Sequence, residues 1–247
     1  MACYIATHKP AQMPLAPWLV PIGLNGFSDE QVRLTDASGD NISHLNREYC
    51  ELTATYWLWK HCQDPYIGLC HYRRLFAFSP VSLPGYQNQP IVQTQIAPQI
   101  LSFLASDAQE QRMMSLLEHY EMIVPQEVMQ YPSLADAFKT AHGEEIWAAF
   151  ANACRDEFGS VVGMLNVENR FHYGNMLVAR ADVFRDYCER LFRVLDRVYA
   201  EVGVPALIEG ARYQPFRYPG YLGERFMNLY LVAMRTRYAC AQSVWFD

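Results

Sequence analysis

The chain has 247 residues, of which 51% are hydrophobic, and a formal net charge of -6. A chain of this size buries about three quarters of its unfolded surface, and its length alone allows one large domain or two small ones. The acidic balance argues against general binding to nucleic acid, which needs a basic surface, but allows a local basic pocket. No apolar stretch is long enough for a membrane span, and the N-terminus lacks the pattern of a secretory signal, so we expect a cytoplasmic protein.

Seven cysteines are scattered singly along the chain, and most lie in apolar segments. This usage indicates buried, reduced thiols. The pairs His61-Cys62 and Cys70-His71 have the side chains of a zinc site, but the Cys-x2-Cys spacing is missing and Cys70 lies within a predicted strand. We therefore expect no metal site among these residues.

Strands and helices alternate from the N-terminus. The stretch CYIATHK (3–9) predicts a first strand, and a polar, turn-rich segment occupies 34–46. Aromatic and leucine residues at helical spacing predict a helix over about 47–61, with Asn46 as its N-cap. A second, apolar strand is expected at 66–70.

No charged residue occurs between Leu75 and Ser106, and four prolines interrupt this stretch. An uncharged segment of this length, broken by prolines, is either a flap over a site or a plain surface loop. We place the candidate flap at about 77–106.

The second half of the chain continues the alternation. The helix expected from Asp182 to about Glu201 is the clearest, because one apolar stripe faces a surface of mixed charge. The other expected elements are helices over 107–120, 133–159 with a break at Gly143, and 222–238, and strands over 120–126 and 170–180. Interleaved strands and helices predict an α/β fold with a mostly parallel central sheet.

The stretch YIGLCHYRRLF (66–76) begins as a buried strand and ends in His71, Arg73 and Arg74. Ligands of α/β folds bind at the carboxyl ends of strands, and guanidinium groups match phosphate oxygens bidentately. The cluster therefore indicates either an anion site, to which His71 also donates, or ordinary salt bridges at the rim of the sheet.

Glu224 follows PGYLG (219–223), in what we expect to be the first turn of the last helix. A helix N-terminus stabilises an ionised carboxylate, and such a carboxylate can act as a general base toward a hydroxyl. Helix-end electrostatics alone is the alternative explanation. Arg212, Arg217 and Arg225 are near it in the sequence. This basic density in an acidic protein indicates an anionic ligand.

Several common catalytic motifs are missing. The sequence has neither type of Gly-rich phosphate loop and no Gly-x-Ser-x-Gly of serine hydrolases. It also lacks an Asp-x-Asp pair at a strand end, the usual device for holding a divalent ion on a nucleotide-sugar diphosphate. The stretch DASGD (36–40) has wider spacing.

Five stretches resemble, in order, a bacterial family found in capsular, exopolysaccharide and O-antigen biosynthesis proteins and long catalogued as a domain of unknown function. They span about residues 3–231 and read ATHKP, GDNISHLNREYCELTATYWLWKH, YIGLCHYRRLF, GNMLVARADVFRDYCERLF and YPGYLGERFMNLYL. The succession of YCELTA and HYRR is a specific signature. The chain departs from the usual pattern at NREYCEL, where NPYYCEL is more common, and in its uncharged insert.

The family resembles glycosyltransferases of GT-A fold, and members are associated with galactofuranosyl transfer from UDP-galactofuranose. The resemblance implies one GT-A-like domain over residues 1–247, with a mostly parallel sheet flanked by helices. It implies an inverting transferase that moves a sugar from a UDP-sugar to a hydroxyl of a growing, lipid-linked surface polysaccharide. A phosphosugar transferase and a non-catalytic scaffold module are the alternatives.

The resemblance also gives the charged clusters roles. In GT-A folds a strand end carries Asp-x-Asp, and HYRR occupies that place here. We therefore expect Arg73 or Arg74, with His71, to offset the diphosphate charge in place of a metal ion, with Arg217 contacting the same group. No metal and no other cofactor is then expected.

Inverting GT-A enzymes use a carboxylate near the start of a late helix to deprotonate the acceptor hydroxyl. Glu224 in GERF fits that role, so it is the expected catalytic base. Asp36 and Asp40 are the next candidates.

Further contacts are implied by the same resemblance. Uridine and ribose are expected at the first strand end and the turn-rich segment, on Thr7, His8, Lys9, Asp36, Asp40 and Asn41. The sugar or acceptor is expected at Asn175, Met176 and Tyr221. The sequence shows no anchor, so a lipid-linked acceptor implies peripheral membrane association or a partner.

Overall fold

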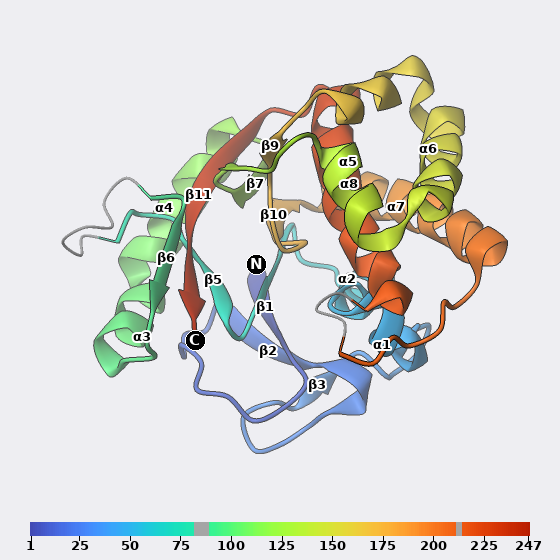
Figure 1. The fold of residues 1–247 in the computed structure, drawn as a ribbon. Helices are drawn as coiled ribbons and strands as arrows, with labels where there is room; N and C mark the ends of the chain where they lie inside the picture. Colours follow the sequence, from blue (N-terminus) through green and yellow to red (C-terminus); the bar gives the residue numbers. More distant parts are fainter. Residues whose placement is uncertain (82–88, 211–213) are drawn as a thin grey trace.

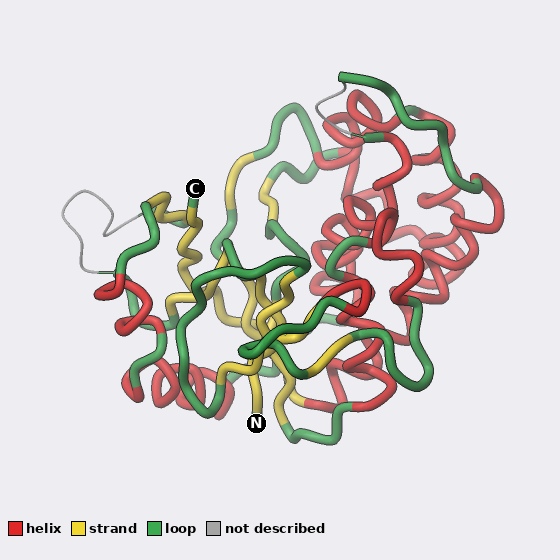
Figure 2. Tube along the Cα trace, turned by 90° about the horizontal axis from the view of Figure 1, so that it is seen from below, coloured by secondary structure: helices red, strands yellow, loops and turns green. Residues whose placement is uncertain are grey.

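The computed structural model describes residues 1–81, 89–210 and 214–247, which form three layers (Figure 1). A mixed β-sheet lies in the middle, with helices on both sides (Figure 2). The strands are β1 (Ala2–Thr7), β2 (Leu19–Gly23), β3 (Leu34–Thr35), β4 (Tyr66–His71), β5 (Arg74–Ala77), β6 (Ile91–Thr94), β7 (Met122–Pro125), β8 (Val128–Met129), β9 (Arg170–Phe171), β10 (Leu177–Arg180) and β11 (Tyr238–Phe246). The α-helices are α1 (Asn46–Tyr49), α2 (Leu52–His61), α3 (Pro98–Leu104), α4 (Asp107–His119), α5 (Leu134–His142), α6 (Glu144–Phe158), α7 (Ala181–Val202) and α8 (Tyr218–Ala233). Short 3-10 helices are η1 (Leu24–Gly26), η2 (Ser43–Leu45), η3 (Gly159–Asn166) and η4 (Pro215–Arg217).

One half of the sheet is parallel, in the order β3-β2-β1-β4. Thr7 lies opposite Gly23, and Ala6 lies opposite His71, so these strands end together. Their shared carboxyl edge is where α/β folds bind ligands. The polar residues that follow β1 and β4 therefore meet at one edge of the sheet.

The other half of the sheet is mixed. β10 runs antiparallel to both β4 and β7, whereas the long β11 is parallel to β6 and β7 but antiparallel to β5. β5 follows β4 after only Tyr72 and Arg73, and so short a connection can join only antiparallel strands. The α/β class is confirmed, and the sheet that we expected to be mostly parallel is mixed, with its parallel strands in one half.

Alternate residues of β1 feed two hydrophobic cores. Tyr4 and Ala6 belong to the core shared with α2 and α5–α8, whereas Cys3 and Ile5 belong to the core under α3 and α4. This period of two follows from strand geometry. Both faces are covered, and five of the seven cysteines are buried free thiols, as the composition predicts.

The helix expected over 47–61 is broken. α1 ends at Tyr49, Cys50 has a positive φ of 53°, and α2 begins at Leu52. Asn46 is the first residue of α1 rather than an N-cap. Its side-chain amide donates to the Cys50 carbonyl oxygen at 2.8 Å and so stabilises the break.

The last helix begins earlier and ends earlier than expected. α8 starts at Tyr218, with Pro219 in its first turn, where a missing N–H leaves no helical hydrogen bond unmade. The chain from Tyr238 onward forms β11 and pairs with the middle of the sheet. The predicted helix over 222–238 is therefore wrong at both ends.

The uncharged segment at 77–106 contributes regular structure to the described part of the chain. β6 pairs with β11, and α3 contacts β5. Residues 82–88 of the candidate flap lie outside the described residues, so its action as a flap stays a prediction. Within the described ranges, no helix is both long and apolar enough to cross a membrane.

Asp36 is a buried anchor between the turn-rich segment and α2. Its Oδ1 accepts hydrogen bonds from Ser43 Oγ at 2.5 Å and from the Gly26 N–H at 3.3 Å, and its Oδ2 accepts from Thr53 Oγ1 at 2.6 Å. The residue is 0% exposed. It therefore has no surface with which to contact the nucleotide expected there, and its role is structural.

Removal of the Asp36 carboxylate should destabilise the fold. We expect Asp36→Ala to lower the free energy of unfolding by about 3 kcal/mol, because three donors lose a charged acceptor. Asp40→Ala is the matched control, since this exposed carboxylate contacts Tyr56 and Lys60 at the surface and its loss should cost within about 0.5 kcal/mol. Urea denaturation measures both, and equal stability of the two variants would contradict the anchoring role.

Candidate active site

A cleft with two joined lobes opens at the carboxyl edge of the parallel strands. The smaller lobe has a volume of about 360 Å³ and the larger about 740 Å³, sizes typical of small-molecule sites. Both lobes share the lining residues Cys50, Glu51, Arg73, Arg74 and Arg217. These residues come from three separate parts of the chain, so only the folded protein brings them together.

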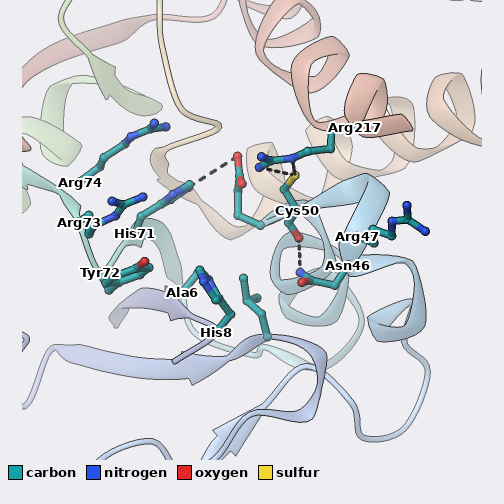
Figure 3. Close-up of a pocket in the computed structure, with 12 residues that line it drawn as sticks. Ala6, His8, Asn46, Arg47, Cys50, His71, Tyr72, Arg73, Arg74 and Arg217 are labelled. Carbon is teal, nitrogen blue, oxygen red and sulfur yellow. Dashed lines mark hydrogen bonds and ion pairs between the residues drawn. The ribbon is translucent and has the colours of Figure 1, made fainter. Parts of the chain in front are cut away.

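The smaller lobe lies between the sheet edge and α1 (Figure 3). His8 follows β1 and Tyr72 follows β4, and their rings meet edge to face at 5.5 Å. Asn46 and Arg47 come from α1. Burial and neighbouring cations lower the pKa of His8, so its ring is neutral near pH 7.

Guanidinium groups face the smaller lobe from two sides (Figure 3). Arg73 and Arg74 lie on the sheet side, where Arg74 stacks over the Trp245 ring at 4.4 Å. Arg217 lies across the lobe, at the end of η4. Flat guanidinium groups around one cavity suit an anion with several oxygens, such as a diphosphate.

The carboxylates at the cleft have other partners. Glu51 faces His71, and Glu224 pairs with Arg225 at 3.1 Å. Neither arginine of the HYRR stretch therefore forms a rim salt bridge with these carboxylates. Salt bridges to these two carboxylates therefore do not explain the cluster, and the anion site stays a prediction.

Cys50 positions Arg217. The Nε and Nη2 groups of Arg217 both donate to Cys50 Sγ at 3.2 Å. Burial raises the pKa of Cys50 to about 12, although the Arg217 cation opposes this shift, so the thiol stays protonated. Because nucleophilic chemistry needs the thiolate, Cys50 is not equipped to act as a nucleophile.

Glu51 lies where the two lobes meet and is absent from the site residues expected from the sequence. Its Oε1 accepts a hydrogen bond from Asn175 Nδ2 at 2.7 Å and lies 3.6 Å from His71 Nε2. In the predicted helix over 47–61, a glutamate such as Glu51 is typical of a face exposed to solvent. Its one signal is its place in YCELTA, a stretch that carries the family resemblance.

His71 lines the cleft, but its Nε2 atom does not offer a hydrogen-bond donor to the cleft. Burial lowers the pKa of His71 more than the Glu51 charge raises it, so the ring is neutral near pH 7. The Nε2 atom is buried and turned toward Glu51, at a distance too long for a hydrogen bond. The expectation that His71 donates directly to a phosphate is therefore not met in this conformation.

The larger lobe is bounded by α5, α8 and β11. The rings of Tyr221 and His142 are tilted by 38° with centroids 4.5 Å apart, and Tyr173 meets Trp245 edge to face at 6.1 Å. Aromatic surface beside a few polar groups is typical of sites for organic ligands. Burial lowers the pKa of His142 to about 4, so its ring is uncharged near neutral pH.

Glu224 lines the larger lobe from the second turn of α8, not from the first turn. The helix terminus that we expected to stabilise its ionised form is therefore too distant to do so. Instead, its Oε1 accepts a hydrogen bond from the Gly174 N–H at 2.8 Å, and Arg225 bonds to Oε2. Burial raises the pKa of Glu224; the Arg225 cation opposes this shift and the Glu51 charge adds to it. A raised pKa makes an ionised carboxylate a stronger base.

Two of the three arginines expected around Glu224 are at the cleft. Arg217 and Arg225 line it, and Arg225 also packs over the Phe171 ring at 4.5 Å. Arg212 lies outside the described residues. In the part of the chain that the structure describes, no three His, Cys, Asp or Glu side chains form a metal-binding cluster.

A tight turn before β10 holds the carboxylates of both Glu51 and Glu224 in place. Gly174 and Asn175 have φ values of 87° and 50°, in the left-handed region. Asn175 Nδ2 bonds to Glu51 and, at 2.9 Å, to the Gly220 carbonyl oxygen. Asn175 and Met176 are 4% and 2% exposed, so neither offers surface to the sugar expected there. Of that expected group, Tyr221 lines the cleft.

At the end of β1, the described lining of the smaller lobe includes His8 but not Thr7 or Lys9. Thr7 is fully buried, and its hydroxyl donates to the Lys9 carbonyl oxygen at 2.6 Å. Lys9 is exposed, with Nζ 5.7 Å from the centre of the Tyr72 ring. Thr7 therefore shapes the turn and Lys9 lies beside the lobe.

The turn-rich segment lies apart from the described lining of both lobes. Asp40 accepts a hydrogen bond from the Tyr56 hydroxyl at 3.0 Å, and Asn41 Nδ2 donates to the Gly39 carbonyl oxygen at 2.8 Å. Asp40 and the buried Asp36 hold the segment against α2, whereas Asn41 bonds within the segment. Asp36 and Asp40 are accordingly poorly placed as alternative bases.

Comparison with known proteins connects this cleft to a family. A family model described as a domain of unknown function (DUF4422) matches residues 2–235. No curated protein matches the chain. The apo structure of WbbM, a bifunctional glycosyltransferase, matches 100% of this chain with a TM-score of 0.83 and 25% identity. This chain spans 45% of that one. The match is in accord with the GT-A-like fold expected from the sequence.

The packing around Asn175 leaves little room for a side chain at Gly223. A Cβ on Gly223 would lie 2.7 Å from Asn175 Oδ1 and 2.9 Å from Leu52 Cδ1. We expect Gly223→Ala to destabilise the fold by about 1–3 kcal/mol, although alanine favours helices. Gly163→Ala, with nothing within 4 Å, is the control and should be neutral. Thermal unfolding measures both, and a more stable Gly223→Ala variant would contradict the packing argument.

Proposed function

The chain belongs to the family described as a domain of unknown function (DUF4422), and we propose that it is an inverting glycosyltransferase that uses a UDP-sugar. The observation that carries the proposal is one cleft in which guanidinium groups and a buried carboxylate lie in adjoining lobes. Nucleotide-sugar transfer needs both parts, since one charge must be stabilised on the leaving diphosphate and one proton removed from the acceptor. The shared fold with part of a bifunctional glycosyltransferase supports the same class of reaction.

We assign the smaller lobe and its border to the donor nucleotide. Arg73, Arg74 and Arg217 face this lobe and would neutralise the diphosphate as it gains charge on leaving. His8 and Tyr72 offer rings beside the base or ribose. Catalysis in this proposal needs no metal ion, because fixed cations supply the positive charge.

We assign the larger lobe to the transferred sugar and the acceptor. Glu224 would accept the proton of the attacking hydroxyl, and Tyr221 offers a ring face to a sugar. The Gly174 N–H and Arg225 fix the carboxylate in place, so only small rearrangement is needed during the reaction. Attack from the side opposite the leaving diphosphate would invert the anomeric centre.

The proposed substrates follow from the family resemblance. They are UDP-galactofuranose and a lipid-linked surface polysaccharide, reached from the cytoplasm by peripheral contact with the membrane or through a partner. Incubation with UDP-galactofuranose and a lipid-linked polysaccharide acceptor, followed by assay of UDP, tests the class of activity. Release of UDP only with acceptor supports transfer, whereas neither release nor UDP binding supports a scaffold module. Transfer of a sugar phosphate would indicate a phosphosugar transferase.

Replacement of the proposed base should separate chemistry from binding. We expect Glu224→Gln to lose at least about 10²-fold in turnover, because a positioned base contributes about that much, while UDP affinity persists. Glu145→Gln, at an exposed residue of α6, is the control and should keep full turnover. Near wild-type turnover of the Glu224 variant would move the base elsewhere.

Replacement of the cationic groups should have the opposite signature. We expect Arg73→Ala and Arg74→Ala each to weaken UDP binding by about tenfold or more, because each loses charged hydrogen bonds. Arg197→Ala, at an exposed residue of α7 paired with Asp156, should leave UDP affinity unchanged. Calorimetry measures the affinities.

The same proposal predicts insensitivity to chelators. We expect turnover to be unchanged in EDTA, because the arginines supply the charge that a divalent ion provides elsewhere. Turnover that collapses in EDTA and returns with manganese would contradict this role of the arginines.

A further inference from the structure

Glu51 and His71 form a largely buried pair that has no role in the proposed reaction. The two side chains are 13% and 16% exposed, and Glu51 Oε1 lies 3.6 Å from His71 Nε2. The Nε2 atom is buried and has no hydrogen-bond partner among the residues that the structure describes. A neutral imidazole beside an ionised carboxylate leaves one net negative charge and one unused proton position between the two atoms.

The surroundings of the pair hold the imidazole neutral. Burial and the cations of Arg74 and Arg73 disfavour the charged ring, whereas Glu51 and a hydrogen bond with the Gly174 backbone favour it. The cations that oppose protonation are the ones that we assign to the diphosphate. An anion bound to them would cancel their effect on His71 and add its own attraction for a proton.

We propose that Glu51 positions His71 to take up one proton when a diphosphate binds, so that the proton lies between Nε2 and Glu51 Oε1. The proposal rests on the proposed function, because it needs a diphosphate on the neighbouring arginines. The proton comes from solvent, and no covalent bond changes. Glu51 acts through His71 and is therefore a positioning residue.

The proton would also change the surroundings of the proposed base. The Glu51 charge is one cause of the raised pKa of Glu224, and the Arg74 cation opposes it. Proton uptake would balance the first of these charges, whereas a bound diphosphate would balance the second.

The charged and titratable groups around the pair come from every neighbouring element. Glu51 and Cys50 come from the break between α1 and α2, Glu224 comes from α8, and the remainder, from the sheet edge and the segment before α8, are His71, Arg73, Arg74 and Arg217. The thiol of Cys50 is protonated throughout the neutral range. Glu224 and His8, whose pKa the Arg73 and Arg217 cations also lower, are therefore the competing sites for a proton, and the test must separate them from His71.

The test measures proton uptake by calorimetry of the full chain in buffers of different ionisation enthalpy. The probe is the β-methyl ester of UDP, whose two phosphates each carry one charge and do not titrate near neutral pH. We expect wild-type protein to take up close to one proton per ligand near pH 6.5–7.5, and the affinity to weaken by up to about tenfold per pH unit as pH rises through this window.

Three variants identify the site of uptake. Glu51→Gln keeps the oxygen that accepts from Asn175 but removes the charge, and His71→Gln removes the ring; we expect both to bind the probe without proton uptake. Glu224→Gln is the control and should take up the proton as wild-type protein does. A purely structural role of Glu51 would alter affinity or folding but leave the proton count unchanged.

Each contrary result has a distinct meaning. Binding without proton uptake in wild-type protein would overturn this inference and leave the proposed function intact. Uptake that persists in Glu51→Gln, or that vanishes in Glu224→Gln, would also overturn it, because the proton would then lie elsewhere. Failure of wild-type protein to bind either the ester or UDP would overturn the proposed function itself.

Discussion

The hydrogen bond from Asn175 Nδ2 to Glu51 Oε1, at 2.7 Å, joins the two halves of the cleft. Glu51 lies at the break between α1 and α2, and Asn175 lies in the turn before β10, 124 residues later in the chain. The adjacent Gly174 N–H fixes Glu224, so one turn sets the positions of both carboxylates. Loss of that turn would remove hydrogen bonds that fix both Glu51 and Glu224.

The charges of the cleft are arranged in order across the fold. Cations come from the sheet edge and η4, and carboxylates come from the helices packed on one face of the sheet. The break at Cys50 brings the helix side toward the sheet edge, and Asn46 stabilises that break. A strand end, a broken helix and a tight turn thus produce a cleft that suits both leaving-group stabilisation and proton removal.

Much of the fold follows from local sequence patterns. The apolar strand at 66–71, the helix break at Gly143 and the long amphipathic α7 are all readable from periodicity. The break at Cys50 is not readable, because it depends on a positive φ at a residue that does not favour one. The antiparallel β10 and β11 also escape such patterns, since a buried strand has the same composition in either direction.

The residues of the candidate site also divide into those that sequence patterns reveal and those that only the fold reveals. The arginines of HYRR and Glu224 can be singled out because charged groups next to apolar segments are conspicuous. Glu51 cannot, because its importance arises from contacts with His71 and Asn175, which are distant in sequence. Conversely, Asp36 and Thr7 have the polarity expected of ligand contacts, yet tertiary packing uses their oxygens internally.

The most direct measurement is a crystal structure of the protein with UDP bound. We expect the diphosphate to lie in the smaller lobe, with its oxygens within hydrogen-bond distance of the Arg73 or Arg74 guanidinium groups and no metal ion between them. Glu224 should remain free of the nucleotide, in the adjoining lobe. A diphosphate held by a metal ion, or nucleotide density outside this cleft, would contradict the account.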